Sequence, residues 1–434
     1  MQNEQFSSKA FKKGRWFIIA EAAVEYFISL CITTTLLTAL LNEMGVDPAL
    51  HGIIGSITSL ACISQLFSVF WIKKSYPAKR WICTLNLVNQ LMFLVLYCIP
   101  FFSFSKEIKL AAFIGILLTA YLFQHYLTPS RTQWHMSLVE DSHRGVFTAK
   151  KEIISLIGGM IFSQSAGILI DYFKAKKDMQ TCFIIFAVTI AVLSFIHFYL
   201  MLSIKEPKPE TQPRKKSFSE IVKLIFGNKK LRSVLAFDAL FAMSGVSLTF
   251  LSVYAMENSE NPNTLGLSAS LMATIGIIHA IFRASVSIPL GRFADKRSWT
   301  SLLRLCLSVM TVGHFLLVFC TPNMGILSLI LYIGYNLCYA FSIAGTNSSL
   351  TNLCFDYVRH EDRRYILGVK NSISGIIAFI TSLLWGAVVS FIQGNGNTLF
   401  GITVYPQQVL SAISAVITLA LVVFVLPTLK KDNK

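Results

Sequence analysis

The chain has 434 residues, of which 54% are hydrophobic and only 14% are charged, against roughly a quarter charged in soluble domains. This composition excludes a water-soluble fold of this length and favours a membrane protein. The formal net charge of +16 would also suit a nucleic-acid-binding protein, so the positions of the basic residues have to decide between the two.

Twelve segments are apolar over the length that a helix needs to cross a bilayer core, about 20 residues. They stay apolar throughout and do not alternate, so we predict helices and not barrel strands. The first is too long for a removable signal peptide and has no small-residue cleavage site. In chain order the predicted spans are Trp16–Leu41, Ala49–Ile72, Trp81–Phe104, Leu110–Val139, Val146–Phe173, Cys182–Leu202, Ser233–Met256, Leu267–Leu290, Thr300–Cys320, Met324–Phe355, Tyr365–Ile392 and Tyr405–Leu426. The expected fold is an all-α polytopic membrane protein with two pseudo-symmetric six-helix bundles.

The basic residues are distributed unevenly between the loops on the two sides. Of the 38 Lys and Arg residues, only the lysines at 106, 109, 174, 176 and 177 lie in one set of loops, and Arg283 lies within a span. All the others fall in the alternate loops and the two tails. Basic loops stay in the cytoplasm, so we predict that both termini are cytoplasmic and that the protein lies in the cell membrane, surrounded by lipid. Nucleic acid is not an expected partner.

Cysteine and histidine give no sign of a metal site. The nine cysteines and eight histidines are scattered, with no Cys-x-x-Cys pair and no His partner at ligand spacing. We expect the cysteines to be packing residues in a reducing compartment, and we expect no metal and no cofactor.

The longest hydrophilic stretch, Lys205–Arg232, divides six spans from six. It begins with a Pro-containing charged segment that is typical of an extended linker. Ser217 and Glu220 then have capping-box spacing ahead of an apolar stripe, which predicts a short helix on the cytoplasmic membrane surface. The predicted domains are therefore residues 1–204, a linker of residues 205–232, and residues 233–434.

Features recur in the two halves at a nearly constant offset. One set of charged residues recurs 220 positions later, and a Ser-x-x-x-Gly sequence in the following span recurs 219 positions later. Together they favour a parallel internal repeat, which is one known way to build a transporter. The matched pairs are Asp141 with Glu361, Arg144 with Arg364, Lys150 with Lys370, Ser163 with Ser382, and Gly167 with Gly386.

The loop Gly291–Arg297 resembles the glycine-x-x-x-aspartate-basic-basic loop of the major facilitator superfamily, and the twelve spans and central linker extend this resemblance over nearly the whole chain. The first-half counterpart, before Lys73, lacks the glycine and aspartate. Span five contains Gly158-Gly159 where the antiporters of that family have Gly-Pro, so drug/proton antiport is not supported. The resemblance implies alternating access, with helices one, four, seven and ten lining a central cavity.

Polar residues in membrane helices are costly, so polar faces are informative. They occur in the four spans that the resemblance makes cavity-lining, and the same residues could instead form hydrogen bonds between helices. Span one carries Glu21, Glu25, Ser29 and Thr33 at four-residue intervals. The candidate solute- or ion-binding residues are Glu25, Tyr121, Gln124, His125, Asp238, Arg283, Tyr332, Asn336 and Tyr339.

Three of these candidates are charges placed inside spans. At about 1.5 Å per residue of helix, Glu25, Asp238 and Arg283 each lie roughly 9–13 Å from the nearest span end. An arginine at that depth needs an acidic partner or water, and Asp238 or Glu25 could provide one. The pair could carry a proton during transport, or it could be a static ion pair that holds helices together.

The repeated loop charges lie where helices meet the cytoplasm. Ion pairs there would be exposed and weak, which suits contacts that break in each transport cycle, although a solvated helix end would look the same. The candidate gating residues are Asp141, Arg144, Lys150, Arg292, Asp295, Glu361, Arg364 and Lys370.

The sequence thus predicts a secondary transporter, a symporter or uniporter, that acts on a small solute and functions as a monomer, with a co-transported proton as a possible second partner. No Gly-x-x-x-x-Gly-Lys sequence occurs, so ATP-driven pumping is not supported. The alternatives are a membrane enzyme, for which His125, His135 and His143 are the candidates but form no known motif, and a membrane scaffold without transport activity. The substrate and the direction of transport are not encoded in any motif.

Overall fold

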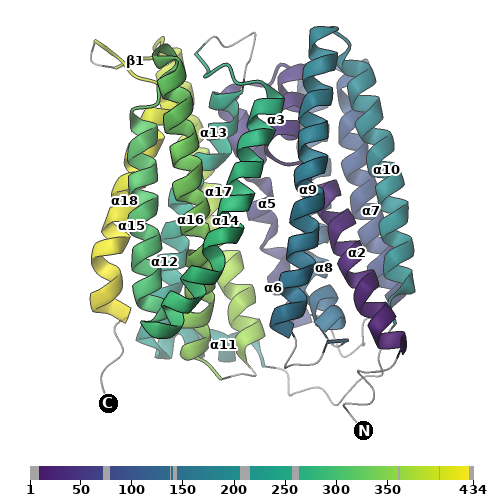
Figure 1. Ribbon diagram of the computed structural model, residues 1–434, viewed down its shortest axis with the longest axis vertical. Coiled ribbons are helices and arrows are strands. Elements are labelled where there is room, and N and C mark those ends of the chain that lie inside the picture. Colours follow the sequence, from purple (N-terminus) through teal and green to yellow (C-terminus); the bar gives the residue numbers. More distant parts are fainter. Residues whose placement is uncertain are drawn as a thin grey trace. The chain divides into compact units, whose positions relative to one another are not determined.

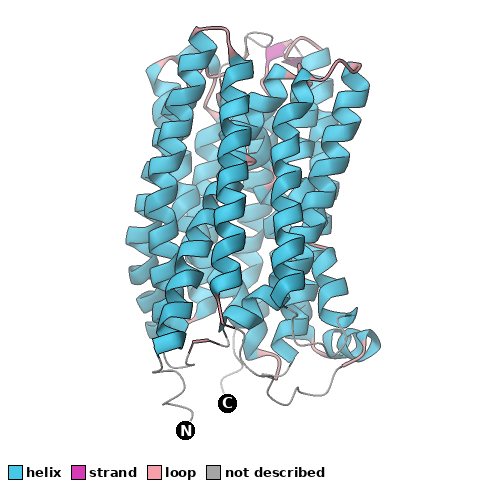
Figure 2. Ribbon diagram, turned by 90° about the vertical axis from the view of Figure 1, so that its right-hand side faces the viewer, coloured by secondary structure: helices cyan, strands magenta, loops and turns pink. Residues whose placement is uncertain are grey.

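The computed structural model describes residues 9–71, 79–136, 138–139, 144–205, 216–256, 263–359, 362–399 and 401–429. Nearly all of these residues are helical (Figure 2). Within this part of the chain, twelve helical stretches are long and apolar enough to cross a membrane. The predicted all-α fold with twelve spans is therefore confirmed.

The spans are labelled in Figure 1 and run in the order of the sequence. Three of them contain more than one helix: α2 (Lys9–Cys31) with α3 (Thr34–Glu43), α4 (Pro48–Gly55) with α5 (Ile57–Ala61) and α6 (Ser64–Trp71), and α12 (Lys229–Gly245) with α13 (Ser247–Ala255). The other nine are α7 (Lys79–Cys98), α8 (Lys106–Met136), α9 (Arg144–Ala175), α10 (Met179–Ser203), α14 (Ala269–Lys296), α15 (Trp299–Val318), α16 (Ile326–Asp356), α17 (Arg363–Gly394) and α18 (Pro406–Leu429). A hairpin of two short strands, β1 (Thr398–Leu399) and β2 (Ile402–Thr403), joins α17 to α18 and was not predicted.

The interrupted spans have Ser and Thr side chains that bond to their own backbone near the breaks. Ser29 Oγ donates to the Tyr26 carbonyl and Thr33 Oγ1 to the Ser29 carbonyl before α3 begins. Ser56 Oγ donates to the Ile53 carbonyl where α4 meets α5. Such bonds compete with the helical ladder and satisfy carbonyl groups that a break in a membrane helix would expose.

The chain forms two compact units, each with its own packing. Unit 1 comprises residues 1–46 and 61–214, and unit 2 comprises residues 47–60 and 215–434. The predicted N-terminal domain, residues 1–204, differs from unit 1 chiefly by the segment Asp47–Leu60, which packs with unit 2. There α4 contacts α13 and α17, and Ser56 Oγ lies 2.5 Å from Ser382 Oγ.

In unit 1, α2 packs against α9 and α10, and α7 packs against α8 and α10. The contact between α2 and α9 depends on the Gly158-Gly159 pair of span five. A Cβ at Gly159 would overlap the ring of Tyr26, and one at Gly158 would lie 2.5 Å from the ring of Phe27. The two glycines therefore allow the aromatic side chains of α2 to lie directly on the backbone of α9.

Gly159→Ala should consequently destabilise the protein by about 1–3 kcal/mol, because the added methyl group forces Tyr26 or a helix to move. Gly115→Ala on α8 is the matched control, since no atom outside its own helix lies within 4 Å of a Cβ there. It should leave stability unchanged or raise it by up to about 1 kcal/mol. Thermal unfolding of the two purified variants checks this, and equal melting temperatures would contradict the close contact.

The linker helix α11 (Phe218–Gly227) occurs where the capping-box spacing predicts it. The backbone N–H of Ser217 donates to Glu220 Oε2 at 2.7 Å. Ile221 is fully buried against unit 2, while Phe218 and Phe226 are exposed. Lys216, just before the helix, forms an ion pair of 2.6 Å with the buried Asp362 at the start of α17.

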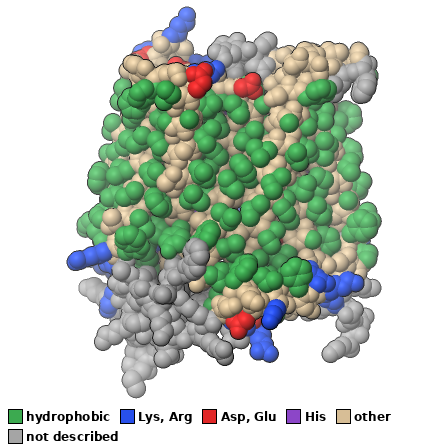
Figure 3. Space-filling view, turned by 180° about the vertical axis from the view of Figure 1, so that it is seen from behind, with side chains coloured by type: hydrophobic (Ala, Val, Ile, Leu, Met, Phe, Trp, Pro, Cys, Tyr) green, Lys and Arg blue, Asp and Glu red, His purple; other side chains and the backbone are tan. Residues whose placement is uncertain are grey.

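The outer faces of the helices are apolar. Large hydrophobic side chains such as Ile184, Val188 and Phe195 on α10 are more than half exposed. On the face drawn in Figure 3, hydrophobic side chains cover the middle of the helices, and Lys, Arg, Asp and Glu lie toward the helix ends. This pattern is the one that lipid contact requires, so the protein is a multi-pass membrane protein.

Candidate functional site

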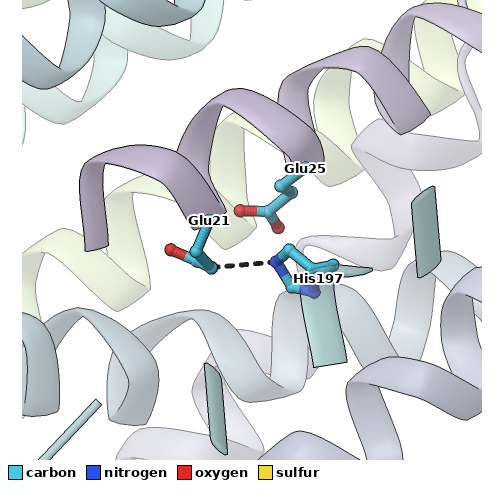
Figure 4. Close-up of side chains that lie close together, drawn as sticks. All are labelled: Glu21, Glu25 and His197. Atoms are coloured by element: carbon cyan, nitrogen blue, oxygen red, sulfur yellow. Dashed lines mark hydrogen bonds and ion pairs between the residues drawn. The ribbon is translucent and has the colours of Figure 1, made fainter. Parts of the chain in front are cut away.

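The most polar buried site in unit 1 is formed by three helices. Glu21 and Glu25 lie one turn apart on α2, Arg131 and His135 lie one turn apart on α8, and His197 lies on α10. Glu25 Oε1 is 2.5 Å from Arg131 Nη1. Glu21 Oε1 is 3.0 Å from His197 Nε2 and 3.8 Å from Arg131 Nη1. We call these five residues the α2–α8–α10 cluster; Figure 4 shows both glutamates and His197.

His197 uses both of its ring nitrogens to connect neighbouring helices. The side-chain amide nitrogens of Asn86 and Gln90 on α7 each lie 3.1 Å from His197 Nδ1. Amide N–H groups donate, so Nδ1 accepts, and Nε2 carries the proton that is donated to Glu21. The imidazole therefore links Glu21 on α2 to Asn86 and Gln90 on α7.

The α2–α8–α10 cluster has unequal numbers of opposite charges. Two carboxylates face one permanent cation, Arg131, within ion-pair distance. His135 Nδ1 lies 3.9 Å from Glu21 Oε2, and His135 is buried. Lys151 on α9 lies further from His135 and interacts with it only through its positive charge. The two carboxylates and Arg131 together carry one negative charge, and one added proton would neutralise it.

The same residues provide the only group of potential metal ligands found in the described part of the chain. Ligand atoms of Glu21, Glu25 and His197 lie within 4.8 Å of one another. The guanidinium of Arg131 occupies the position beside Glu25 where a cation would bind. The arrangement is thus already an ion pair, and a metal ion would have to displace Arg131.

The other candidates of unit 1 lie about two to three turns before Arg131 on α8. Tyr121 is buried, and its hydroxyl donates to the Ile32 carbonyl at 3.4 Å. His125 Nδ1 lies 3.2 Å from the amide nitrogen of Gln65. Gln124 is partly buried, and its carbonyl accepts a bond from Thr128. These three side chains follow the predicted face of span four.

In unit 2, Asp238 on α12 pairs with Lys370 on α17. Asp238 Oδ1 lies 2.9 Å from Lys370 Nζ, both residues are buried, and the Ser374 hydroxyl donates to Asp238 Oδ2. Lys370 was predicted to lie in an exposed gate at the helix end, and this placement is wrong. It lies two turns into α17, where an ammonium group requires a carboxylate. Its repeat counterpart, Lys150, is exposed on α9.

Arg283 does not make the predicted ion pair. The partner of Asp238 is Lys370, and the partner of Glu25 is Arg131. Among the described residues, no carboxylate lies within 4.0 Å of Arg283. This prediction failed because the distance along one helix from its end gives depth but does not show which neighbouring helix the side chain faces.

The candidates on α16 lie together and face α14. His279 Nδ1 donates to the Asn336 carbonyl at 3.1 Å, and its ring centre lies 5.6 Å from that of Tyr339. Tyr335 stacks on Tyr339 at 6.1 Å. Asn336 Nδ2 donates to the carbonyl of the buried Tyr332. The structure thus brings Asn336 and Tyr339 together against His279, one turn before Arg283, with Tyr332 and Tyr335 adjoining them on α16.

The remaining gating candidates are only partly described. Asp141 and Glu361 lie outside the described residues, and Arg144 and Arg364 are described as backbone alone, in the first turns of α9 and α17. Arg292 and Asp295 are exposed in the last turns of α14. A gating role for all of these residues stays a prediction.

The sequence interpretation missed several members and neighbours of the α2–α8–α10 cluster: Glu21, Arg131, His135, His197, Asn86 and Gln90. A signal for some of them was present. The polar face of span four continues from Thr128 to Arg131 and His135 at helical spacing, and Asn86 and Gln90 are separated by one turn. Arg131 had been counted with the cytoplasmic basic residues, although the predicted span Leu110–Val139 includes it, and α8 continues to Met136. His197 is isolated in its span and gave no signal.

The chain has the same fold as several solved structures. A mutant of the nucleoside transporter NupG is 14% identical with a TM-score of 0.73, covering 96% of this chain and all of NupG. A D-xylose–proton symporter is 12% identical with a TM-score of 0.72, covering 98% of this chain and all of the symporter. A bacterial homologue of the human lysosomal transporter Spinster is 14% identical with a TM-score of 0.65, covering 97% and 96% of the two chains.

No curated protein matched the sequence. A family profile described as Major Facilitator Superfamily does match, over residues 22–388, which is most of the chain. That range includes nearly all of the candidate site residues. The match identifies a transporter and not an enzyme, in agreement with the neighbouring structures. The chain belongs to the Major Facilitator Superfamily.

Proposed function

We propose that this protein is a secondary active transporter that moves a small solute across the cell membrane by alternating access and couples this movement to protons. The observation that carries the proposal is the α2–α8–α10 cluster, in which two carboxylates face a single permanent cation inside a membrane unit. Ionisable residues inside membrane spans are rare and mark substrate or ion pathways in many transporters.

The cluster supports proton binding through its charge. An uncompensated negative charge is costly in a low-dielectric interior, so a proton that neutralises it is favoured when the site is closed to water. When the site is open to water, hydration stabilises the ionised form and the proton can leave. Glu25 is 21% exposed at its side chain and Glu21 only 1%, so Glu25 is the better placed of the two for exchange of the proton with water.

The Asp238–Lys370 pair of unit 2 has balanced charges. One carboxylate meets one ammonium group, and a serine hydroxyl satisfies the second carboxylate oxygen. Neutralising either member would leave the other charge buried without a partner. We therefore assign this pair to stability and the α2–α8–α10 cluster to coupling.

Alternating access is supported by the two compact units, because two bodies with separate cores can rock about a central site. Asp295, exposed near the end of α14, lies outside the candidate binding residues. Asp295→Asn should slow solute exchange severalfold while leaving the dissociation constant unchanged. Equilibrium binding and counterflow on the same preparation check this, and a normal exchange rate would remove Asp295 from the gate.

The orientation of the chain follows from its basic loops and can be tested by cysteine labelling. A thiol introduced at Gln212, in the central linker, should not react with an impermeant maleimide added to intact cells, and it should react after the cells are opened. The parent protein with its nine native cysteines is the control. Labelling of Gln212→Cys in intact cells would place the linker outside and reverse the topology.

Transport itself is tested with the purified full-length protein. A thermal-shift screen against metabolites identifies solutes that stabilise it, and each such solute is then offered to vesicles that contain the protein, with protein-free vesicles as control. A solute that stabilises the protein should enter only the protein-containing vesicles and should accumulate when the pH gradient is directed inward. Equal entry into both kinds of vesicle would contradict transport, and conversion of lipid or solute to a new product would favour the enzyme alternative.

A further inference from the structure

Arg283 lies well inside a membrane helix. It is fourteen residues from the start of α14 (Ala269–Lys296) and seven from Leu290, where the predicted span ends, about 20 Å and 10 Å away at 1.5 Å per residue. Neither helix end can therefore be reached by extending the side chain, and Arg283 must be stabilised at the depth where it lies.

The neighbouring turns of α14 show which way Arg283 faces. One turn earlier, His279 donates to the Asn336 carbonyl of α16. About one turn later, Val286 packs on the apolar cluster formed by Leu290, Ala294, Leu302 and Cys306, which Phe341 of α16 also contacts. Arg283 occupies the same stripe of α14 between these contacts, so its side chain lies along α16 and is half-buried.

Arg283 differs in one respect from Arg131 and Lys370, two basic residues that also lie inside helices. Arg131 has Glu25 and Glu21, and Lys370 has Asp238. Arg283 has no carboxylate within 4.0 Å among the described residues. A guanidinium group at that depth is stable only with an anionic partner or water. One turn before Arg283 on the same helix, the ring of His279 lies 5.6 Å from that of Tyr339.

We propose that Arg283 binds the anionic group of the transported solute, and that the solute is a small organic acid or phosphate whose uncharged part packs beside Tyr339. This proposal rests on the proposed function and adds the substrate class to it. A guanidinium group can hold a carboxylate or a phosphate through two parallel hydrogen bonds, and the aromatic ring provides a flat apolar surface for the remainder. An uncharged analogue of the solute would lack the anionic group that Arg283 binds.

The first test needs no knowledge of the solute. A functional arginine without a partner destabilises the empty protein, whereas a structural one stabilises it. Arg283→Met should therefore melt at or above the temperature of the wild type when both are purified without solute. Arg304→Gln, an exposed basic residue on α15, is the matched control and should be unchanged. A melting temperature several degrees lower for Arg283→Met alone would show that Arg283 is structural and would overturn the proposal.

The second test uses matched pairs of solutes that differ in charge, glucose with gluconate and uridine with uridine 5′-monophosphate, in binding and counterflow with the full-length protein. Only anionic members should bind, and gluconate against the nucleotide separates carboxylate from phosphate recognition. Arg283→Gln should weaken anion binding at least tenfold, Arg283→Lys should weaken it less, and Arg304→Gln should leave it unchanged. Counterflow of a neutral member, equal in wild type and Arg283→Gln, would overturn the anion proposal while preserving transport. Absence of counterflow with all four solutes and with every metabolite from the stability screen would count against both.

Discussion

Replacement of Glu25 by glutamine should abolish the accumulation of solute in response to a pH gradient while leaving solute exchange intact. An amide keeps the shape of the carboxyl group but cannot take up a proton. With one proton per solute molecule, a gradient of one pH unit supports at most about tenfold accumulation in the wild type. In Glu25→Gln the ratio should fall to about one, because solute still crosses but no proton movement drives it.

The stability of Glu25→Gln separates coupling from a static ion pair. Arg131 keeps a second carboxylate, Glu21, at 3.8 Å, so the substitution does not leave the guanidinium unpaired, and the melting temperature should change little. A stabilising role of the 2.5 Å contact between Glu25 and Arg131 would instead lower the melting temperature. Normal accumulation by Glu25→Gln would exclude it as the coupling residue and direct attention to Glu21, which lies one turn away.

The second large effect is on stability and concerns Asp238 and Lys370. Lys370→Met should destabilise the protein by about 3–5 kcal/mol, because the buried Asp238 carboxylate loses its only basic partner among the described residues and keeps only the hydroxyl of Ser374. Asp238→Asn should be comparably harmful, since it leaves the ammonium group buried without a counter-charge. Thermal or denaturant unfolding in detergent measures both changes.

The double variant Asp238→Asn/Lys370→Met is the control. If the damage comes from an uncompensated charge, removing both charges should recover most of the lost stability, and the two single effects should be strongly non-additive. Additive losses in the double variant would show that the two side chains act separately. Loss of transport with full stability in the single variants would reassign the pair to the transport cycle.

The spans and the linker helix could be predicted because each depends on information local to the sequence. A run of about 20 apolar residues is sufficient for a membrane helix, since every backbone group must bond within the segment. The capping box at Ser217 and Glu220 likewise depends on a spacing of three residues, and α11 begins at Phe218 as expected. The breaks within the first, second and seventh spans were missed, because Ser and Thr occur both in straight and in interrupted membrane helices.

The partners of the charges could not be predicted, because they depend on which helices pack together. Glu25, Asp238 and Arg283 were correctly placed inside spans, yet Arg131 and Lys370 had been assigned to helix ends near the cytoplasm. Both basic residues lie inside the predicted spans Leu110–Val139 and Tyr365–Ile392, but position in a span does not show which neighbouring helix a side chain faces. The internal repeat was also a poor guide, since Lys370 is buried in a pair while its counterpart Lys150 is exposed.

Proton movement driven by solute is the most direct test of coupled transport. Vesicles that contain the full-length protein and an internal pH dye are given an identified solute on the outside, with no pH gradient and with the membrane potential clamped. Proton-coupled transport predicts that inward solute flow acidifies the interior in wild-type vesicles and leaves the pH unchanged in those with Glu25→Gln. Solute entry into wild-type vesicles at its normal rate with no change in internal pH would contradict proton coupling.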